Sequence, residues 1–271
     1  HFITMADVES AMIKVIAGPE KKSRLVSEQE RKLTAYHEAG HAVVMNALEH
    51  CDPVHQITIV PRGLTGGMTI SLPQEDKSFN SRLEMEERIV SLLGGRIAEK
   101  LVLNDISTGA SNDIQRATNI ARAMVTKYGM SDKLGAVVYD SDNNEVFLGR
   151  DFGHTKSYSE KVAAIIDDEV KSIIDGAYER CEKILRENMD ILEKTAKYLL
   201  ENESMDGETF AYLCKNRELP SAEKAKSDSE PVLKGADKFN SMMDQFFGEK
   251  ANDEASEKNH DAGTAQKTDK M

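Results

Sequence analysis

Apolar residues recur every three or four positions along most of the chain, which is the period of an amphipathic helix. Serine stands three residues before glutamate at Ser27, Ser81 and Ser157, a spacing typical of the capping box that opens a helix. Helices are predicted over residues 5–16, 27–50, 81–103, 111–128, 157–188, 191–202 and 207–216. Because glycine inside a helix costs about 1 kcal/mol relative to alanine, the pair Gly94 and Gly95 predicts close packing in the third of these helices.

The remaining ordered segments have the composition of short β-strands. Strands are predicted over residues 54–60 and 68–72 and, in shorter form, over residues 136–139 and 146–148. Between the first two, Pro61, Gly63, Gly66 and Gly67 provide residues typical of turns. The predicted fold class is therefore mostly α with a small β element.

The composition changes after Pro220. Residues 221–271 are rich in Ser, Lys, Asp, Glu, Ala and Asn, and such a segment cannot bury enough apolar surface to fold. An apolar cluster at residues 239–247 interrupts it. This cluster is either an exposed patch in a disordered tail, which we favour, or a segment that binds a partner.

Charge and cysteine content exclude several classes of protein. Lys and Arg total 35 and Asp and Glu total 47, giving a net charge of −12. Without a basic cluster, this balance argues against a nucleic-acid partner. Three cysteines without a CxxC pair argue against a disulfide framework. No apolar run approaches the ~18 residues of a transmembrane helix, and the start at His1 rather than Met indicates a fragment of a longer protein.

One motif carries chemistry. Residues 37–41 read HEAGH, an HExxH pattern inside a predicted helix. His37 and His41 lie one turn apart on the same helix face, so both imidazoles can reach one zinc ion. Glu38, rotated by about 100° from His37, can face the attacking water and act as general base. The composition predicts only about 0.02 chance copies of this pattern, which favours a metal site over coincidental histidines.

A catalytic zinc site also needs a third protein ligand. The metzincin pattern is excluded, because Val44 and Ala47 occupy the positions where it requires Gly and His. A thermolysin-like site would take a glutamate from the next helix. The candidates of that kind are Glu84, Glu86, Glu87 and Glu99. Asp113, in the first turn of a later helix, is the other option, although the helix dipole favours a carboxylate there without any metal. The residues alone leave this choice open.

Several motifs, in order along the chain, resemble the protease domain of the FtsH family of membrane-anchored AAA+ zinc metalloproteases. They read AYHEAGHA at 35–42, GGRIAE at 94–99, STGASNDI at 107–114, YGMS at 128–131, VFLGR at 146–150 and NMDIL at 188–192. The resemblance covers roughly residues 1–217. It implies a helical zinc metalloprotease domain that forms a hexameric ring.

The resemblance also assigns roles to individual residues. It implies that His37, His41 and Asp113 bind one zinc ion per subunit and that Glu38 is the catalytic base. Glu99 would then support the site from outside the ligand set or serve the fold. In relatives, an edge strand beside the cleft pairs with an extended substrate, and residues 66–70 correspond to this strand.

The resemblance further implies a domain organisation. Residues 1–18 would be the last helix of the AAA+ lid, 19–26 a linker, 27–217 the zinc peptidase domain and 218–271 a disordered acidic and polar tail. The chain contains no phosphate-binding loop, so ATP is expected only in a missing ATPase module.

The expected whole protein is a homohexamer that uses ATP to degrade unfolded and membrane proteins. It would lie at the cytoplasmic face of a bacterial inner membrane, or at an organellar membrane. We expect the fragment itself to be soluble, with a membrane attachment only through the missing N-terminal segment.

Two other functions compete with this interpretation. One is a non-catalytic helical assembly module with a vestigial metal site, and the intact set of His37, Glu38, His41 and Asp113 argues against it. The other is a zinc hydrolase that acts on something other than peptides. The β-like segment beside the motif fits a peptide-binding edge and favours the peptidase.

Overall fold

The computed structural model describes residues 26–62, 65–73, 77–139 and 158–220, together with isolated positions before residue 20. Within residues 1–220 the chain forms one compact unit. The strand predicted at 146–148 and the apolar cluster at 239–247 lie outside the described residues, as does most of the helix predicted at 5–16.

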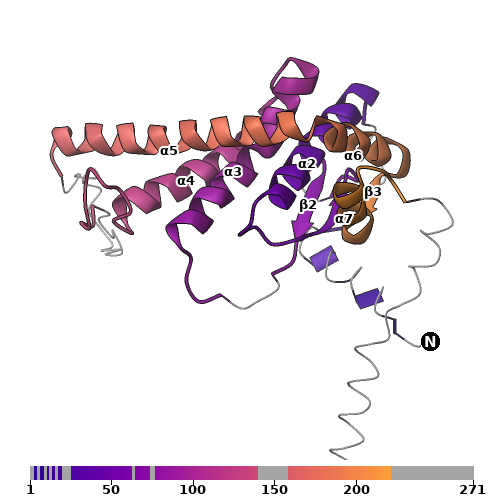
Figure 1. Cartoon of the computed structure of the whole chain (residues 1–271), viewed down its shortest axis with the longest axis horizontal. Helices are drawn as coiled ribbons and strands as arrows, with labels where there is room; N and C mark the ends of the chain where they lie inside the picture. The colour runs from indigo at the N-terminus through magenta and orange to yellow at the C-terminus, as the bar shows by residue number, and fades with distance from the viewer. Residues whose placement is uncertain are drawn as a thin grey trace, which may run out of the picture. The chain divides into compact units, whose positions relative to one another are not determined.

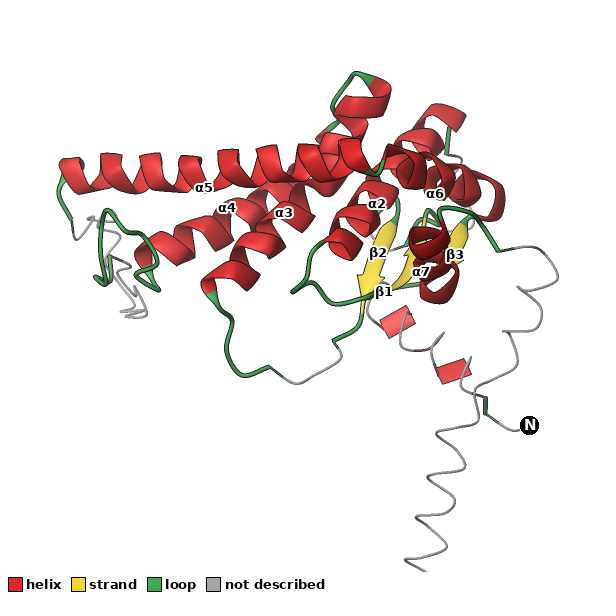
Figure 2. Ribbon diagram, in the orientation of Figure 1, coloured by secondary structure: helices red, strands yellow, loops and turns green. Residues whose placement is uncertain are grey.

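The helices predicted from residue 27 onward are confirmed, with ends that shift by a few residues. They are α2 (Glu28–Ala47), α3 (Arg82–Ala98), α4 (Ser111–Thr126), α5 (Glu160–Glu187), α6 (Met189–Asn202) and α7 (Gly207–Asn216) (Figures 1 and 2). A π-helical turn (Glu99–Leu103) continues α3, and a 3₁₀ turn (Thr108–Ala110) leads into α4.

Serine caps determine where several helices begin. The hydroxyl of Ser27 accepts a hydrogen bond from the third residue of α2, and Ser81 and Glu84 form a complete capping box on α3. A cap of this kind typically contributes about 1 kcal/mol. Helix α5 begins later than predicted, because Ser159 rather than Ser157 is its cap.

The β element is a three-stranded antiparallel sheet with the strand order β2-β1-β3. Its strands are β1 (Val54–Thr58), β2 (Met68–Ser71) and β3 (Ser204–Asp206). Ile57 of β1 faces Thr69 on one side and Met205 on the other. Among the described strands, β2 is therefore an edge strand. The sequence did not predict β3, because three residues are too few to show an alternating pattern.

The segment 136–139, predicted as a strand, is a loop, so that prediction is wrong. The N–H of Tyr139 donates to the carbonyl of Thr126 at 2.8 Å, which ties the loop to the end of α4 instead of to a sheet. Gly129 and Gly135 have φ values of 61° and 68° and allow the chain to reverse. Val137 and Val138 are exposed, and of this segment Tyr139 packs against the core.

Helix α2 is the central element of the fold (Figure 1). It packs against α3, α5 and α6 and also contacts strands β1 and β2. Its Ala35, Ala39 and Ala42 are fully buried, and these small side chains allow neighbours to approach closely. A Cβ placed on Gly40 would lie only 2.5 Å from the carbonyl oxygen of Gly94. Helices α2 and α3 therefore cross with their backbones in contact.

The core extends from the sheet through α2 and α3 to α5, α6 and α7. Its largest fully buried apolar side chains are Ile57, Ile89, Ile97, Met124, Ile166, Leu185, Leu192, Leu199, Met205, Phe210 and Leu213. None of the helices in the described part of the chain is both long and apolar enough to pass through a bilayer.

Alanine at Gly94 tests the crossing of α2 and α3. A Cβ there would lie 2.8 Å from the carbonyl oxygen of Gly40 and 3.0 Å from the Cα of His41. Because both are backbone atoms, Gly94→Ala should lower the free energy of unfolding by about 1–3 kcal/mol, the usual cost of overpacking. Denaturant titration measures this change.

The matched control is Gly176→Ala in α5, where a Cβ would meet nothing within 4 Å. Glycine inside a helix is unfavourable by about 0.5–1 kcal/mol, so this variant should be as stable as the wild type or slightly more so. Equal effects of the two alanines would contradict backbone contact between α2 and α3.

Candidate metal centre

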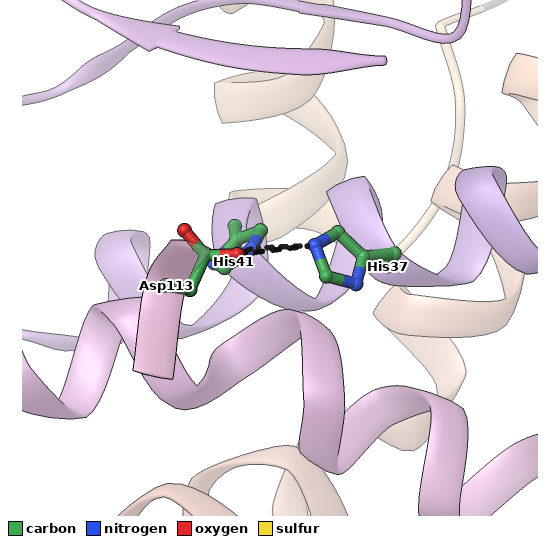
Figure 3. Close-up of side chains that lie close together, drawn as sticks. All are labelled: His37, His41 and Asp113. Atoms are coloured by element: carbon green, nitrogen blue, oxygen red, sulfur yellow. Dashed lines mark hydrogen bonds and ion pairs between the residues drawn. The ribbon is translucent and has the colours of Figure 1, made fainter. Parts of the chain in front are cut away.

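Three of the predicted site residues converge from two helices (Figure 3). Helix α2 presents His37 and His41, and Asp113 lies in the first turn of α4. The two Nε2 atoms are 3.1 Å apart. The Oδ2 atom of Asp113 lies 3.4 Å from the Nε2 of His37 and 3.5 Å from that of His41. The side chains are 12–18 % exposed, so solvent can reach the cluster.

The spacing of these three atoms fits a zinc ion. Bonds of about 2.0–2.1 Å in a tetrahedron place neighbouring ligand atoms about 3.3–3.4 Å apart, close to the observed distances of 3.1, 3.4 and 3.5 Å. Imidazole nitrogens and a carboxylate oxygen are ligands that zinc prefers, and three protein ligands leave a fourth position open. The donor set therefore fits a catalytic site better than a closed structural one.

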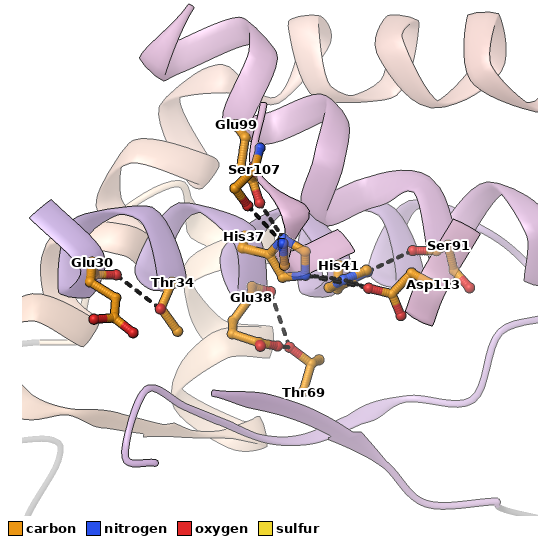
Figure 4. Close-up of polar contacts among 11 residues, drawn as sticks. Glu30, Thr34, His37, Glu38, His41, Thr69, Ser91, Glu99, Ser107 and Asp113 are labelled. Carbon is orange, nitrogen blue, oxygen red and sulfur yellow. Dashed lines mark hydrogen bonds and ion pairs between the residues drawn. The ribbon is translucent and has the colours of Figure 1, made fainter. Parts of the chain in front are cut away.

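Each imidazole is oriented through its other nitrogen (Figure 4). The Nδ1 of His37 lies 2.7 Å from Oε1 of Glu99, and the Nδ1 of His41 lies 2.8 Å from the carbonyl oxygen of Ser91. A carboxylate and a carbonyl are acceptors, so each Nδ1 carries a hydrogen and donates it. This tautomer leaves both Nε2 lone pairs available to a metal ion.

Glu99 is itself held in place. It begins the π-helical turn after α3, and its side chain is fully buried. One carboxylate oxygen accepts from His37, and the other accepts from the N–H of Ser107 at 2.8 Å. Because Ser107 begins the segment that leads into α4, a single carboxylate links the orientation of His37 to the loop that delivers Asp113.

Gly95 makes room for the ring of His37. A Cβ at this position would lie 2.5–2.6 Å from three ring atoms of the imidazole. The sequence predicted close packing at Gly94 and Gly95 as a pair, and the structure assigns them different neighbours. Gly94 contacts the backbone of α2 at Gly40, whereas Gly95 faces the side chain of His37.

Burial and hydrogen bonding act in opposite directions on the charges of the cluster. Burial alone would lower the pKa of His37, but hydrogen bonds with Asp113 and Glu99 outweigh it and raise the pKa to about 10. Burial would raise the pKa of Asp113, yet His37 and His41 hold it well below its usual range. Burial would likewise raise the pKa of Glu99, but hydrogen bonds with His37 and Ser107 outweigh it and lower the pKa. In the absence of metal, a proton on His37 therefore balances the carboxylates.

Glu38 lies beside the cluster. Its side chain is buried, and this burial raises its pKa, with partial opposition from the nearby His41 and His37. Its Oε2 accepts a hydrogen bond from the hydroxyl of Thr69 on β2 at 2.8 Å (Figure 4). A buried carboxyl with a raised pKa next to a candidate metal site suits a group that takes and releases a proton.

The glutamates of α3 that the sequence offered as third ligands have other partners. Glu84 closes the capping box of α3, and Glu86 pairs with an arginine one turn earlier. Glu87 pairs with Arg180 of α5 at 2.6 Å. These three residues hold the ends and faces of α3 in place and are not part of the cluster.

Glu99, the remaining alternative, approaches His37 from the opposite side of the ring. It contacts Nδ1, whereas the nitrogen that faces His41 is Nε2. Among the described residues, Asp113 is the carboxylate that comes close to both Nε2 atoms. The geometry therefore favours Asp113 over Glu99 as the third ligand.

Three supporting groups were missed in the sequence. Ser91 acts through its main-chain carbonyl and Ser107 through its main-chain N–H, groups that nearly every residue has. Thr69 acts through its side chain, but it stands on a strand far along the chain from Glu38. The glycines that precede that strand were the only nearby sequence feature that pointed to it, and they indicated an edge strand rather than a hydrogen-bond partner for Glu38.

Comparisons with known proteins identify relatives of this chain. A sequence profile described as peptidase family M41 matches residues 24–213. ATP-dependent zinc metalloprotease FtsH 1 of Thermoanaerobacter sp. (strain X514) is 61% identical over 198 residues, which cover 73% of this chain and 32% of that protein.

Two further relatives have names of the same kind. ATP-dependent zinc metalloprotease FtsH 2 of Alkaliphilus metalliredigens (strain QYMF) is 61% identical over 204 residues, covering 75% of this chain and 30% of its own. ATP-dependent zinc metalloprotease FtsH of Bacillus subtilis (strain 168) is 50% identical over 205 residues, which cover 75% of this chain and 32% of that protein. The chain spans about a third of the length of these curated relatives.

Alanine substitutions should show which of the two carboxylates next to His37 contributes more to zinc affinity. Asp113→Ala should lower zinc affinity by well over a hundredfold, because it removes an atom placed to bind the ion. Glu99→Ala should lower it by about 10–100-fold, the typical effect of losing a group that orients a ligand. Competition titration against a zinc chelator measures both. The reverse order would show that Glu99 is the ligand and Asp113 is not.

Zinc binding should displace a proton from His37. With a pKa of about 10, the ring is protonated at pH 8 without metal, whereas a metal ligand must be neutral. Calorimetric titration in two buffers of different ionisation enthalpy should therefore show proton release, and apparent zinc affinity should rise with pH up to about 10. Glu99→Gln removes one cause of the raised pKa, so proton release should cease at a lower pH in this variant than in the wild type. The same pH limit in both proteins would contradict this assignment.

Proposed function

This chain belongs to peptidase family M41, and from that membership we propose that it is the peptidase part of an ATP-dependent zinc metalloprotease. The proposed reaction is hydrolysis of internal peptide bonds in protein substrates. The proposed ligands of its single zinc ion are His37, His41 and Asp113, and the proposed general base is Glu38.

One observation carries the proposal. The Nε2 atoms of His37 and His41 and a carboxylate oxygen of Asp113 lie 3.1–3.5 Å from one another. The Nδ1 atoms of both rings are already bonded to acceptors. Three donors that face one point, with both imidazoles held through their outer nitrogens, support a preformed site for a catalytic ion.

Zinc, when bound, would polarise the carbonyl of the peptide bond and make a water molecule more acidic. Glu38 then accepts a proton from the water as its oxygen bonds to the carbonyl carbon. The same carboxyl delivers that proton to the departing amine as the C–N bond breaks. Its burial suits both roles, because a carboxyl whose pKa is raised gives up a proton less readily to solvent and holds it for the leaving group.

The activity of the whole protein is part of the proposal, because this chain spans only about a third of its relatives. Their names describe ATP-dependent enzymes. Since this chain has no phosphate-binding loop, an ATPase module elsewhere would couple nucleotide hydrolysis to substrate delivery. We further propose a homohexamer that acts on unfolded and membrane proteins at a membrane surface, attached through a segment outside this chain.

The domain limits are also proposed. The peptidase domain would span residues 27–217, and the profile match over residues 24–213 supports this extent. Residues 1–18 would belong to the lid of the ATPase module, 19–26 would be a linker and 218–271 a tail outside the peptidase.

The alternative of a helical assembly module with a vestigial site is not favoured. A vestigial site has no requirement for a buried Glu99 that orients one histidine, or for a glycine at position 95 that makes room for the ring. Metal binding without cleavage would be the result that supports it.

Glu38→Gln tests the role of the base. The variant should keep its zinc, because Glu38 is not among the proposed ligands, and should lose about 10²–10⁴-fold in kcat, the usual contribution of a general base. Zinc content and cleavage of a quenched fluorescent peptide measure the two properties. Glu28→Gln, an exposed position in the first turn of the same helix, is the matched control and should retain activity. Substantial turnover by the zinc-loaded Glu38→Gln protein would rule out this role.

A further inference from the structure

Strand β2 contacts helix α2 at Glu38. The hydroxyl of Thr69 on β2 lies 2.8 Å from Oε2 of Glu38 and 3.1 Å from the main-chain carbonyl oxygen of the same residue. Figure 4 shows the side chain of Glu38 directed from α2 toward this threonine. Within the described residues, Thr69 is the group that hydrogen bonds to the Glu38 carboxyl.

A second contact holds β2 close to Glu38. A Cβ placed on Gly67, just before the strand, would lie 2.9 Å from Cγ of Glu38 and 2.6 Å from Cγ2 of Thr34. Any side chain at this position would push the strand away from the helix. Gly67 therefore allows the close approach, and Thr69, two residues later, makes the hydrogen bond.

We propose that Thr69 is a positioning residue for the general base, fixing the Glu38 carboxyl from the edge strand β2. The proposal rests on the proposed function, because it presumes that Glu38 is the base. The hydrogen bonds of Thr69 in the described part of the chain go to Glu38 and to none of the three proposed zinc ligands, so its effect would pass through Glu38.

A glutamate needs such a partner at this position. Its side chain has several rotatable bonds, and an error of about 1 Å in placing a catalytic group can cost about 10²-fold in rate. The Glu38 side chain is buried, so water does not hold its carboxyl in a single orientation. A hydroxyl from a neighbouring strand supplies that restraint.

The hydroxyl can serve both protonation states of the base without moving. When Glu38 is a carboxylate, the hydroxyl donates to Oε2. When Glu38 has taken a proton, the hydroxyl can rotate, accept from Oε2–H and donate to the main-chain carbonyl at 3.1 Å. Serine shares this ability and valine lacks it, which makes those two substitutions informative.

The primary experiment compares Thr69→Val with Thr69→Ser in the full chain loaded with zinc. Valine keeps the shape and the β-propensity of threonine and replaces the hydroxyl with a methyl group. It should lower kcat for a quenched peptide by about 10–100-fold, with KM and zinc affinity within about threefold of the wild type. Serine should restore kcat to within about threefold of the wild type.

Thr118→Val is the matched control. Thr118 lies on α4, and its hydroxyl donates to the main-chain carbonyl of Ile114 within that helix. This variant should leave kcat unchanged. Equal kcat in Thr69→Val and Thr118→Val would overturn the proposal, and so would failure of serine to restore activity, because a hydroxyl at position 69 would then not be sufficient.

A measurement on the zinc-free chain tests the hydrogen bond independently of cleavage. Thr69→Val and Glu38→Ala each remove one partner of the same bond. The melting temperature of the double variant should therefore fall by less than the sum of the two single shifts. Additive shifts would overturn the proposal. Thr126→Val, whose hydroxyl bonds within α4, should be additive with Glu38→Ala.

The two measurements separate this proposal from the proposed function. If the zinc-loaded wild type cleaves the peptide and Glu38→Gln is inactive, the kcat of Thr69→Val tests the role of Thr69 alone. The shifts in melting temperature could instead be non-additive in a chain that binds zinc but does not cleave peptides. That result would overturn the proposed function but support the hydrogen bond between Thr69 and Glu38.

Discussion

The metal centre depends on one contact, the backbone-to-backbone crossing of helices α2 and α3. Packed helices usually stand 8–10 Å apart because side chains lie between them. At Gly40 and Gly94 no side chain intervenes. This closeness brings the carbonyl of Ser91 within reach of His41 and places the backbone of α3 against the ring of His37. A wider crossing would break these contacts, and neither imidazole would keep its orientation.

The site also has an unusual balance of buried charge. Glu38, Glu99 and Asp113 place three carboxyl groups around two imidazoles, all at least partly buried. Buried charges of one sign are costly unless they are compensated. In the metal-free chain, the raised pKa of His37 favours a proton that offsets part of this charge, and burial shifts the pKa of Glu38 upward, which acts in the same direction. A divalent cation provides the same compensation, which gives a physical reason for zinc to stabilise the fold that binds it.

Much of the site could be predicted from local sequence, because helical geometry fixes local relationships. The spacing of His37 and His41 determines that both rings lie on one face, and the capping patterns at Ser27 and Ser81 located two helix starts. The third ligand could not be predicted in this way, since Asp113 meets the histidines only through the packing of α4. Family resemblance, not spacing, selected it.

The sequence failed where tertiary contacts override local preference. The apolar segment 136–139 has the composition of a strand, but its last residue bonds to the end of α4. Strand β3 has too few residues to show a pattern, and it exists because β1 offers a free edge to pair with. The hydrogen bonds to Ser91 and Ser107 use main-chain groups, and a sequence does not distinguish those from any others.

The position of Asp113 on a different helix from the histidines has a mechanical consequence. An ion held by His41 and Asp113 together would cross-link two points roughly 70 residues apart in the chain. The chain-entropy model assigns about 4 kcal/mol to a cross-link that closes a loop of that length. Zinc would then fasten α4 to the packed pair of α2 and α3 in addition to its chemical role. The segment between Glu99 and Asp113 would be the part of the domain that loosens first when the ion is withdrawn, with faster amide exchange there than in α2.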